Sequence, residues 1–394
     1  MTKSQQVLLA LLKKSLFNID ISLPSEVNWQ EVYDEAVSQS VVPIAYDGTA
    51  GVTDIPREIA KKFKDYSLAV FLQNDSVLKG QRDVAELLQQ NGIAYAILKG
   101  ASVARYYSKP ELRTLGDVDL LVSKADFEDT KKLLVSNGYT LTREEKNHFH
   151  CNFKKQDVIF ELHFEMSDFP NTPLCNELRK ELDKAVSSVE KVEYMGNSFY
   201  SLDALYQACS LLLHTERHIS KDGIGLRQLI DFGFFAKENY ELFSDENFVT
   251  FLKKFGLNKL ATICFDVFKK YFLNEDVQNS VADDLIEMSL VKGNFGFKQD
   301  DEQMLSNRVL GSRKGANRFF VIRWFRYFKY RSSITWELAK THTWLSNLAF
   351  VYLPIRFLFR LAIGKKEKID FNSVIDSSKS ENDLYSQFGM FEKE

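Results

Sequence analysis

The chain has 394 residues, which is enough for two or three cores because domains usually run to about 100–200 residues. Its 45% hydrophobic and 27% charged content, with only 18 Gly and 7 Pro, excludes a disordered or collagen-like protein. The net charge of -3 gives no overall attraction to nucleic acid or to an anionic membrane, so only a local patch could bind either partner.

The first 90 residues are predicted to form a helical segment. Apolar side chains recur there at helical spacing, for example at Trp29, Val32, Tyr33 and Ala36. The opening stretch, MTKSQQVLLALLKKSLF, has no small-residue cleavage site after its apolar run, so it predicts an amphipathic helix rather than a signal peptide. The four cysteines stand far apart without CxxC or CxxH spacing, which indicates neither a zinc site nor a disulfide framework and favours a reducing cytoplasm.

Residues 91–200 are predicted to hold a small α/β core. The apolar run at 93–98 ends at a Lys-Gly turn and predicts a buried strand, and GDVDLLV at 116–122 predicts a second. Further strands are expected at YTLT and HFHCNF, and DVIFELHFEM at 157–166 is the most strand-like stretch of the chain. The pattern at 201–310 is helical again. The expected fold class is therefore α+β, with a small mixed sheet embedded in a largely helical protein.

Two carboxylates, Asp117 and Asp119, are predicted to share one face of the second strand, because strand residues two apart point the same way. Neighbouring carboxylates repel each other unless a cation lies between them. Mg²⁺ prefers oxygen ligands and is often held by one or two carboxylates together with substrate phosphates. Gly116 would let a phosphate chain approach the backbone closely. These residues predict a magnesium site.

A third acid, Glu161, lies in the strand VIFELHF and shares a face with His163. If this strand lies beside GDVDLLV, three carboxylates converge, which suits two Mg²⁺ ions that activate an attacking hydroxyl and stabilise a leaving pyrophosphate. Gly100 and Ser102 begin a predicted helix, whose free N–H groups favour phosphate. The alternatives are that Glu161 faces water at a sheet edge and that His163 is a structural histidine, since Mg²⁺ rarely binds imidazole.

The order of these motifs resembles the nucleotidyltransferase superfamily that includes DNA polymerase beta. The motifs are LKGAS, GDVDLLV and the lone acid of FELH, and they lie between Leu98 and His163. More narrowly, the run is similar to a bacterial group of largely uncharacterised nucleotidyltransferases that carry a helical N-terminal segment. The resemblance implies that Asp117, Asp119 and Glu161 bind two metal ions and catalyse the reaction, and that the Lys-Gly turn binds the triphosphate of an NTP.

The resemblance also implies roles for residues around the acids. Lys99 and Arg113 match fixed features of the narrower group and could neutralise the triphosphate, Arg113 with bidentate geometry. Ala101 stands where the superfamily usually has a second Gly or Ser, so the hydroxyl role is assigned to Ser102.

In related enzymes a helical domain closes over the nucleotide and the acceptor. On that basis His163, His214, Arg227 and Asp231 are assigned to the acceptor side of the site. Arg227 and Asp231 stand four residues apart on one predicted helix face, so an intrahelical salt bridge without a catalytic role is the alternative.

The last third of the chain is predicted to contain a basic aromatic helical segment at 311–370 and a polar tail at 371–394. Residues 313–368 include 13 Lys and Arg against 2 acids, a local charge of +11. The apolar stretch at 344–364 has the length of a membrane span, but a proline and two arginines interrupt it. Three interpretations stay open: contact of 316–364 with an anionic membrane surface, packing in the core, and RNA binding, with the membrane favoured over RNA.

The predicted function is transfer of a nucleoside monophosphate from an NTP to an unknown hydroxyl-type acceptor, with release of pyrophosphate. The expected location is the cytoplasm, with peripheral contact at the inner face of the membrane as an option. One alternative is a toxin-like enzyme that modifies tRNA, for which the basic aromatic segment would be the RNA platform. Another is an inactive scaffold near membrane glycan synthesis. The three acids argue against the scaffold, because a scaffold has no chemical need for clustered carboxylates.

Overall fold

The structure, a computed structural model, describes residues 1–144, 149–167, 173–221, 223–294, 297–298, 348 and 387–389. The chain forms two compact units: Met1–Arg217, Ile224–Phe297 and Gly389–Glu394 make up the first, and His218–Gly223 and Lys298–Phe388 the second. The description below concerns the first unit. The predictions made for 311–370 and 371–394 fall outside the described residues, apart from 348 and 387–389, and stay predictions.

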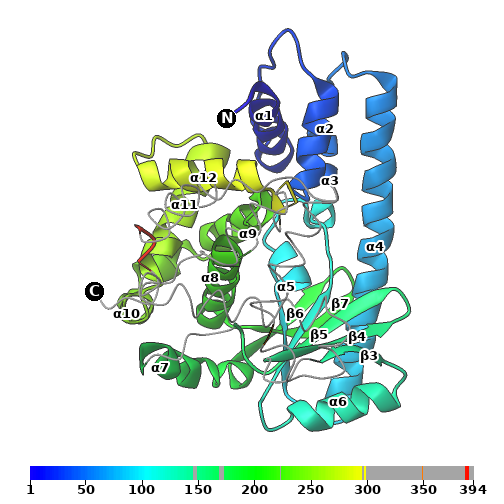
Figure 1. Ribbon diagram of the computed structural model, residues 1–394, viewed down its shortest axis with the longest axis vertical. Helices are drawn as coiled ribbons and strands as arrows, with labels where there is room; N and C mark the ends of the chain where they lie inside the picture. The colour runs from blue at the N-terminus through cyan, green and yellow to red at the C-terminus, as the bar shows by residue number, and fades with distance from the viewer. Residues whose placement is uncertain are drawn as a thin grey trace. The chain divides into compact units, whose positions relative to one another are not determined.

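Helices both precede and follow the strands in the described part of the chain (Figure 1). The helices are α1 (Lys3–Phe17), α2 (Trp29–Ser38), α3 (Val42–Gly48), α4 (Arg57–Gln90), α5 (Gly100–Ala104), α6 (Phe127–Ser136), α7 (Pro173–Leu182), α8 (Ala204–Lys221), α9 (Leu226–Glu238), α10 (Glu246–Lys254), α11 (Asn258–Phe272) and α12 (Ser280–Lys292). The strands are β1 (Tyr95–Leu98), β2 (Val118–Val122), β3 (Thr140–Glu144), β4 (His150–Lys155), β5 (Val158–His163), β6 (Val189–Tyr194) and β7 (Asn197–Leu202). The predicted α+β class is confirmed.

The N-terminal helices begin with side-chain caps and lead into one long helix. Thr2 and Gln5 form a capping box at the start of α1, and the side chain of Asn28 accepts a hydrogen bond from the backbone of Glu31 at the start of α2. α4 has 34 residues, so it is about 50 Å long. It contacts α2 and α3 and extends to the sheet (Figure 1).

The seven strands form one mixed sheet in the order β3-β4-β5-β2-β1-β7-β6. β2 runs parallel to β5 and β1 parallel to β7, and the other neighbouring pairs are antiparallel. The five strands expected from the sequence are present as β1 to β5. The hairpin of β6 and β7 is absent from the sequence prediction. Its two-residue turn has φ of 47° at Met195 and 75° at Gly196, as a type I′ hairpin turn requires.

Alternation along β2 and β5 divides the sheet into an apolar face and a polar face. Val118 of β2 and Phe160 of β5 belong to the apolar core, to which α4 and α6 also contribute. A Cβ atom at Gly80 of α4 would lie 3.0 Å from the ring of Phe160, so the glycine lets α4 approach the sheet closely. The intervening residues of both strands therefore point to the opposite face.

The helices after the sheet pack around α9. A Cβ atom at Gly233 of α9 would lie 1.9 Å from the ring of Phe268 on α11, so only glycine permits this close helix contact. α9 also contacts α5, the short helix that follows β1. Among the described helices, none combines the length and the apolar character that a membrane span requires.

Candidate functional site

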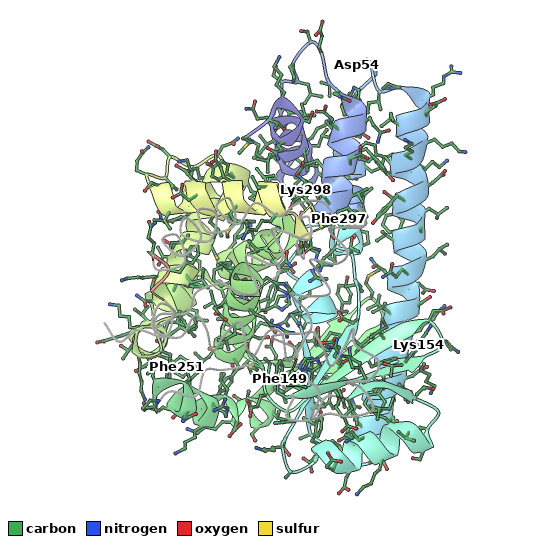
Figure 2. All side chains as sticks on the ribbon, viewed as in Figure 1. Asp54, Phe149, Lys154, Phe251, Phe297 and Lys298 are labelled. Atoms are coloured by element: carbon green, nitrogen blue, oxygen red, sulfur yellow. The ribbon has the colours of Figure 1, made fainter. Side chains whose placement is uncertain are left out.

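The register of β2 against β5 brings two of the predicted acids together. In this parallel pair Asp119 lies opposite Glu161, and Leu121 lies opposite His163. The expectation that the two strands are neighbours is confirmed. Phe149, labelled in Figure 2, lies next to this group, with its ring centroid 5.8 Å from that of His163.

Asp119, Glu161 and His163 form a compact cluster. Nε2 of His163 lies 3.0 Å from Oδ1 of Asp119 and 3.4 Å from Oε2 of Glu161. Asn152 of β4 donates a hydrogen bond of 2.8 Å to Oε1 of Glu161. Asp119 and His163 are buried, whereas Glu161 is half-buried. One ligand atom from each of the three residues lies within 4.8 Å of the others, which is close enough to share one metal ion.

Lys99 supplies positive charge beside this cluster. Its Nζ lies 3.0 Å from Oδ2 of Asp119 and 3.4 Å from Nδ1 of His214 on α8. Lys99 follows the last residue of β1, and its φ of 50° is unusual for a residue with a side chain. Gly100 continues the turn with a φ of 46°. The strained turn thus places the ammonium group next to Asp119 on the neighbouring strand.

The charges of the cluster stabilise one another. Burial would raise the pKa of Asp119, but the charge of Lys99 and the hydrogen bond from His163 outweigh burial and lower it. Burial would also raise the pKa of Glu161, and there His163 is the main partner that lowers it. Burial would lower the pKa of His163, whereas its hydrogen bonds to the two carboxylates raise it. Both acids are therefore ionised at neutral pH.

Asp117 stands at the edge of the cluster. It immediately precedes β2 and is exposed. Desolvation of its carboxyl group by the surrounding protein raises the pKa of Asp117 to about 6. The negative charge of Asp119 contributes to this rise, and the positive charge of Lys99 opposes it. Asp117 is not one of the three residues whose ligand atoms lie within 4.8 Å of one another. Its assignment as a metal ligand therefore stays a prediction.

The turn residues predicted to bind phosphate differ in how open they are. A Cβ atom at Gly100 or Gly116 would meet no atom within 4 Å, so a ligand can approach the backbone at both. Ser102 is fully buried, and its hydroxyl donates a hydrogen bond of 2.6 Å to the carbonyl of Lys99. This hydroxyl satisfies the backbone of the strained turn, so its position does not support the triphosphate role assigned to Ser102.

Arg113 forms a buried ion pair instead of facing the acids. Its Nε and Nη2 each lie 2.7 Å from an oxygen of Asp231 on α9. Tyr107 donates a third hydrogen bond, of 2.6 Å, to the same carboxylate. The bidentate geometry expected for the triphosphate is thus used within the protein, because a buried guanidinium needs a carboxylate partner. The positions of Arg113 and Asp231 support neither the triphosphate role nor the acceptor-side role assigned to them.

Two other residues assigned to the acceptor side lie near the acids. His214 of α8 contacts Lys99, as described above. Arg227, near the start of α9, is half-buried and donates a hydrogen bond of 3.3 Å to the carbonyl of Thr114. Burial and the charge of Arg113 lower the pKa of Arg227, and the charge of Asp117 acts in the opposite direction. Arg227 is therefore within electrostatic reach of the edge of the cluster.

The sequence prediction does not include two residues that support the site, Asn152 and Tyr107. Asn152 alternates with Cys151 and Phe153 in β4, and that period-two pattern could have placed its amide on the polar face beside Glu161. No local pattern could have identified Tyr107, because its partner Asp231 is 124 residues away in the sequence.

The donor set of the cluster fits a divalent cation. Asp119 and Glu161 offer carboxylate oxygens on adjacent strands, and the lowered pKa of each shows that it is held in the ionised form that binds metal. A divalent ion between them would relieve the repulsion of two closely spaced negative charges.

Comparison with known families supports this chemistry. The sequence model of a family described as an uncharacterised nucleotidyltransferase matches residues 25–272. This range includes the whole sheet, the acidic cluster and helices α2 to α11. A comparison with curated proteins gives no significant match.

The buried ion pair predicts a large stability effect. We expect Asp231→Asn to lower the free energy of unfolding by about 3–5 kcal/mol, because it leaves the buried charge of Arg113 without its carboxylate. Urea unfolding measures the change. Asp75→Asn is the control, since it removes an exposed ion pair with Lys79 on α4 and should have little effect. Equally small effects of both substitutions would contradict the assigned role.

The raised pKa of Asp117 predicts a pH-dependent effect on stability. The folded protein binds the proton of this carboxyl group more tightly than the unfolded chain, so ionisation costs stability as the pH rises from about 4 to about 6. In the absence of divalent ions, Asp117→Asn should therefore raise the melting temperature at pH 7.5 and change it little at pH 4. Thermal unfolding at the two pH values tests this. A variant that is less stable than the native protein at pH 7.5 would show that ionised Asp117 is not destabilising.

Proposed function

The chain belongs to this family of uncharacterised nucleotidyltransferases, and we propose that it transfers a nucleoside monophosphate from an NTP to a hydroxyl-type acceptor, with release of pyrophosphate, in a Mg²⁺-dependent reaction. Family membership implies a nucleotide substrate. The observation that carries the proposal is the pairing of Asp119 with Glu161 across parallel strands, beside the ammonium group of Lys99.

We propose that Asp117, Asp119 and Glu161 hold two Mg²⁺ ions together with the NTP. When bound, the ions would lower the pKa of the attacking hydroxyl and neutralise charge on the triphosphate and the leaving pyrophosphate. The lowered pKa values of Asp119 and Glu161 keep these carboxylates ready to bind at neutral pH. Asp117 titrates at about pH 6 in the absence of ions, and a cation beside it would hold it ionised.

The turn after β1 is proposed to receive the triphosphate. Nζ of Lys99 lies 3.0 Å from Oδ2 of Asp119, so a phosphate oxygen that binds beside this carboxylate could accept a hydrogen bond from the same ammonium group. Gly100 and Gly116 leave their backbone open on this side of the cluster. The phosphates can therefore approach both backbone and ammonium, which orients the reacting phosphorus towards the acids.

The acceptor is proposed to enter between the sheet and the helices that follow it. His214 of α8 and Arg227 of α9 both lie within reach of the acidic cluster through Lys99 and Asp117 respectively. Arg227 offers a cation for an anionic acceptor or for phosphate, and His214 offers a hydrogen-bonding group. The buried pair of Arg113 and Asp231 would hold α9 in place.

Binding of Mg-NTP is predicted to stabilise the protein through Asp119. At a ligand concentration of about 100 times the Kd, binding contributes about 2.7 kcal/mol, which raises the melting temperature by several degrees. Asp119→Asn should abolish the rise, because it removes the carboxylate shared by Lys99 and the cluster. Asp129→Asn, which changes an exposed acid on α6, should retain it. An unchanged shift in Asp119→Asn would place the nucleotide site elsewhere.

The position of the label in an NTP tests the reaction itself. With Mg²⁺ and a cell lysate, label on the α-phosphate should appear in an acceptor, whereas label on the γ-phosphate should appear only in pyrophosphate. Separating products into protein, RNA, lipid and small molecules would identify the class of acceptor. Asp119→Asn is the inactive control. Transfer of γ-label above that of the lysate alone, dependent on the added protein, would indicate a kinase and overturn the proposal.

A further inference from the structure

The position of His163 points to a role that the three carboxylates do not include. Resting on the proposed function, we infer that Nε2 of His163 is a direct ligand of a metal ion held between Asp119 and Glu161. This position would then bind a first-row transition ion such as Mn²⁺ in preference to Mg²⁺. The ion that arrives with the triphosphate is a separate one.

The distances within the cluster match those between atoms that share one ion. Two ligands about 2.1 Å from an ion are separated by about 3.0 Å when they meet at a right angle, and by about 3.4 Å at a tetrahedral angle. Nε2 of His163 lies 3.0 Å from Oδ1 of Asp119 and 3.4 Å from Oε2 of Glu161. Two of the three pairs of ligand atoms thus already have the separation that a shared ion requires, and all three atoms lie within 4.8 Å of one another.

The ring of His163 is held where it points at the acids. His163 ends β5 and is 3% exposed. The ring of His150, its cross-strand neighbour on β4, stacks against it at 5.1 Å, and Phe149 lies at 5.8 Å. The rings of Phe149 and His150 are themselves in contact, with centroids 4.7 Å apart, and packing against this pair restricts the ring of His163 as a metal ligand requires.

A hydrogen bond is the competing explanation of the same distances. Nε2 would then keep a proton and donate it to Asp119, whose Oδ1 lies 3.0 Å away. Coordination instead requires the lone pair of Nε2, so the ion displaces that proton and the ring carries its remaining proton on Nδ1. Nδ1 is buried and accepts or donates no hydrogen bond within the described part of the chain. Without an ion the two carboxylates would hold a proton on Nε2, whereas with a bound ion that proton would be lost, so the two explanations differ in a measurable way.

The nitrogen ligand decides which ion is preferred. Mg²⁺ binds oxygen ligands almost exclusively and dehydrates reluctantly, whereas transition ions accept imidazole nitrogen. A site with two carboxylates and one imidazole therefore favours a transition ion. The second proposed ion, between Asp117 and the triphosphate, has only oxygen ligands and has no such preference. The transition ion would take the place of one of the two Mg²⁺ ions of the proposed function, so the enzyme would hold two different ions.

Pulsed electron paramagnetic resonance of Mn²⁺ bound to the intact chain tests the inference directly. At pH 8 and without nucleotide, we expect the modulation that a directly bound nitrogen produces. Growth with ¹⁵N-histidine should change the modulation, which assigns it to imidazole. Bound Mn²⁺ without nitrogen modulation would overturn the inference, because it would leave His163 a hydrogen-bond donor.

Two substitutions assign the signal to one ring. His163→Gln should remove the nitrogen modulation while leaving an amide oxygen in its place. It should also lower the affinity for Mn²⁺ relative to Mg²⁺ by about tenfold or more, the loss that follows even from removing an outer-shell partner. His150→Gln is the matched control on the adjacent strand and should retain the modulation. Retention of the modulation by His163→Gln would overturn the assignment.

These experiments distinguish a failure of the inference about His163 from a failure of the proposed function. Binding of Mg-NTP and transfer of the α-label would persist if His163 were only a hydrogen-bond donor, and the inference alone would fail. If the chain bound neither Mn²⁺ nor Mg-NTP, the proposed function would fail as well.

Discussion

The structure depends on keeping two carboxylates side by side in a partly buried place. Parallel pairing of β2 with β5 forces Asp119 and Glu161 together, and their repulsion would destabilise the sheet without nearby positive charge. Lys99 and His163 provide it, and both are positioned at a cost: Lys99 by a turn with positive φ, and His163 by burial. A protein that gains nothing from these carboxylates would be more stable with apolar residues in their place. Their presence, with compensating charges beside them, supports the proposed binding site.

Burial of the apolar face of the same sheet offsets the energetic cost of placing charged residues on the polar face. α4 and α6 bury the alternate residues of β2 and β5, and Gly80 lets α4 approach the sheet closely. The polar face is instead supported by ion pairing between sheet and helices. Arg113, just before β2, is held by Asp231 of α9. Because a broken buried pair leaves an uncompensated charge, this contact fixes α9, and with it Arg227, relative to the acids.

Local patterns in the sequence were sufficient for the sheet centre and its acids, and insufficient for contacts between distant residues. Period-two alternation identified β2 and β5 and placed their acids on one face. The hairpin of β6 and β7 was missed, because β6 is rich in charged residues and the turn is Met-Gly rather than Asn-Gly. The phosphate role of Arg113 was inferred from the family resemblance, and no local pattern shows its actual partner, Asp231, which lies 118 residues away. A motif does not show which of its side chains are buried. Ser102 is buried, whereas Gly100 and Gly116 are open to a ligand.

The charges around Asp119 also determine what a nucleotide must displace. Each oxygen of this carboxylate already has a positively charged or hydrogen-bonding partner, Lys99 on one and His163 on the other, so an ion that binds it competes with one of these contacts. If Mg²⁺ bound Asp119 alone, the ion would neutralise this carboxylate, and the ammonium group of Lys99 would lose its partner. Free NTP would bring negative charge to two ionised acids. In the proposed reaction the complex of the two avoids both penalties, because the ion takes the carboxylate oxygen while the phosphates take the ammonium group. Exchange of cations at Asp119 therefore favours the metal–nucleotide complex over either component alone.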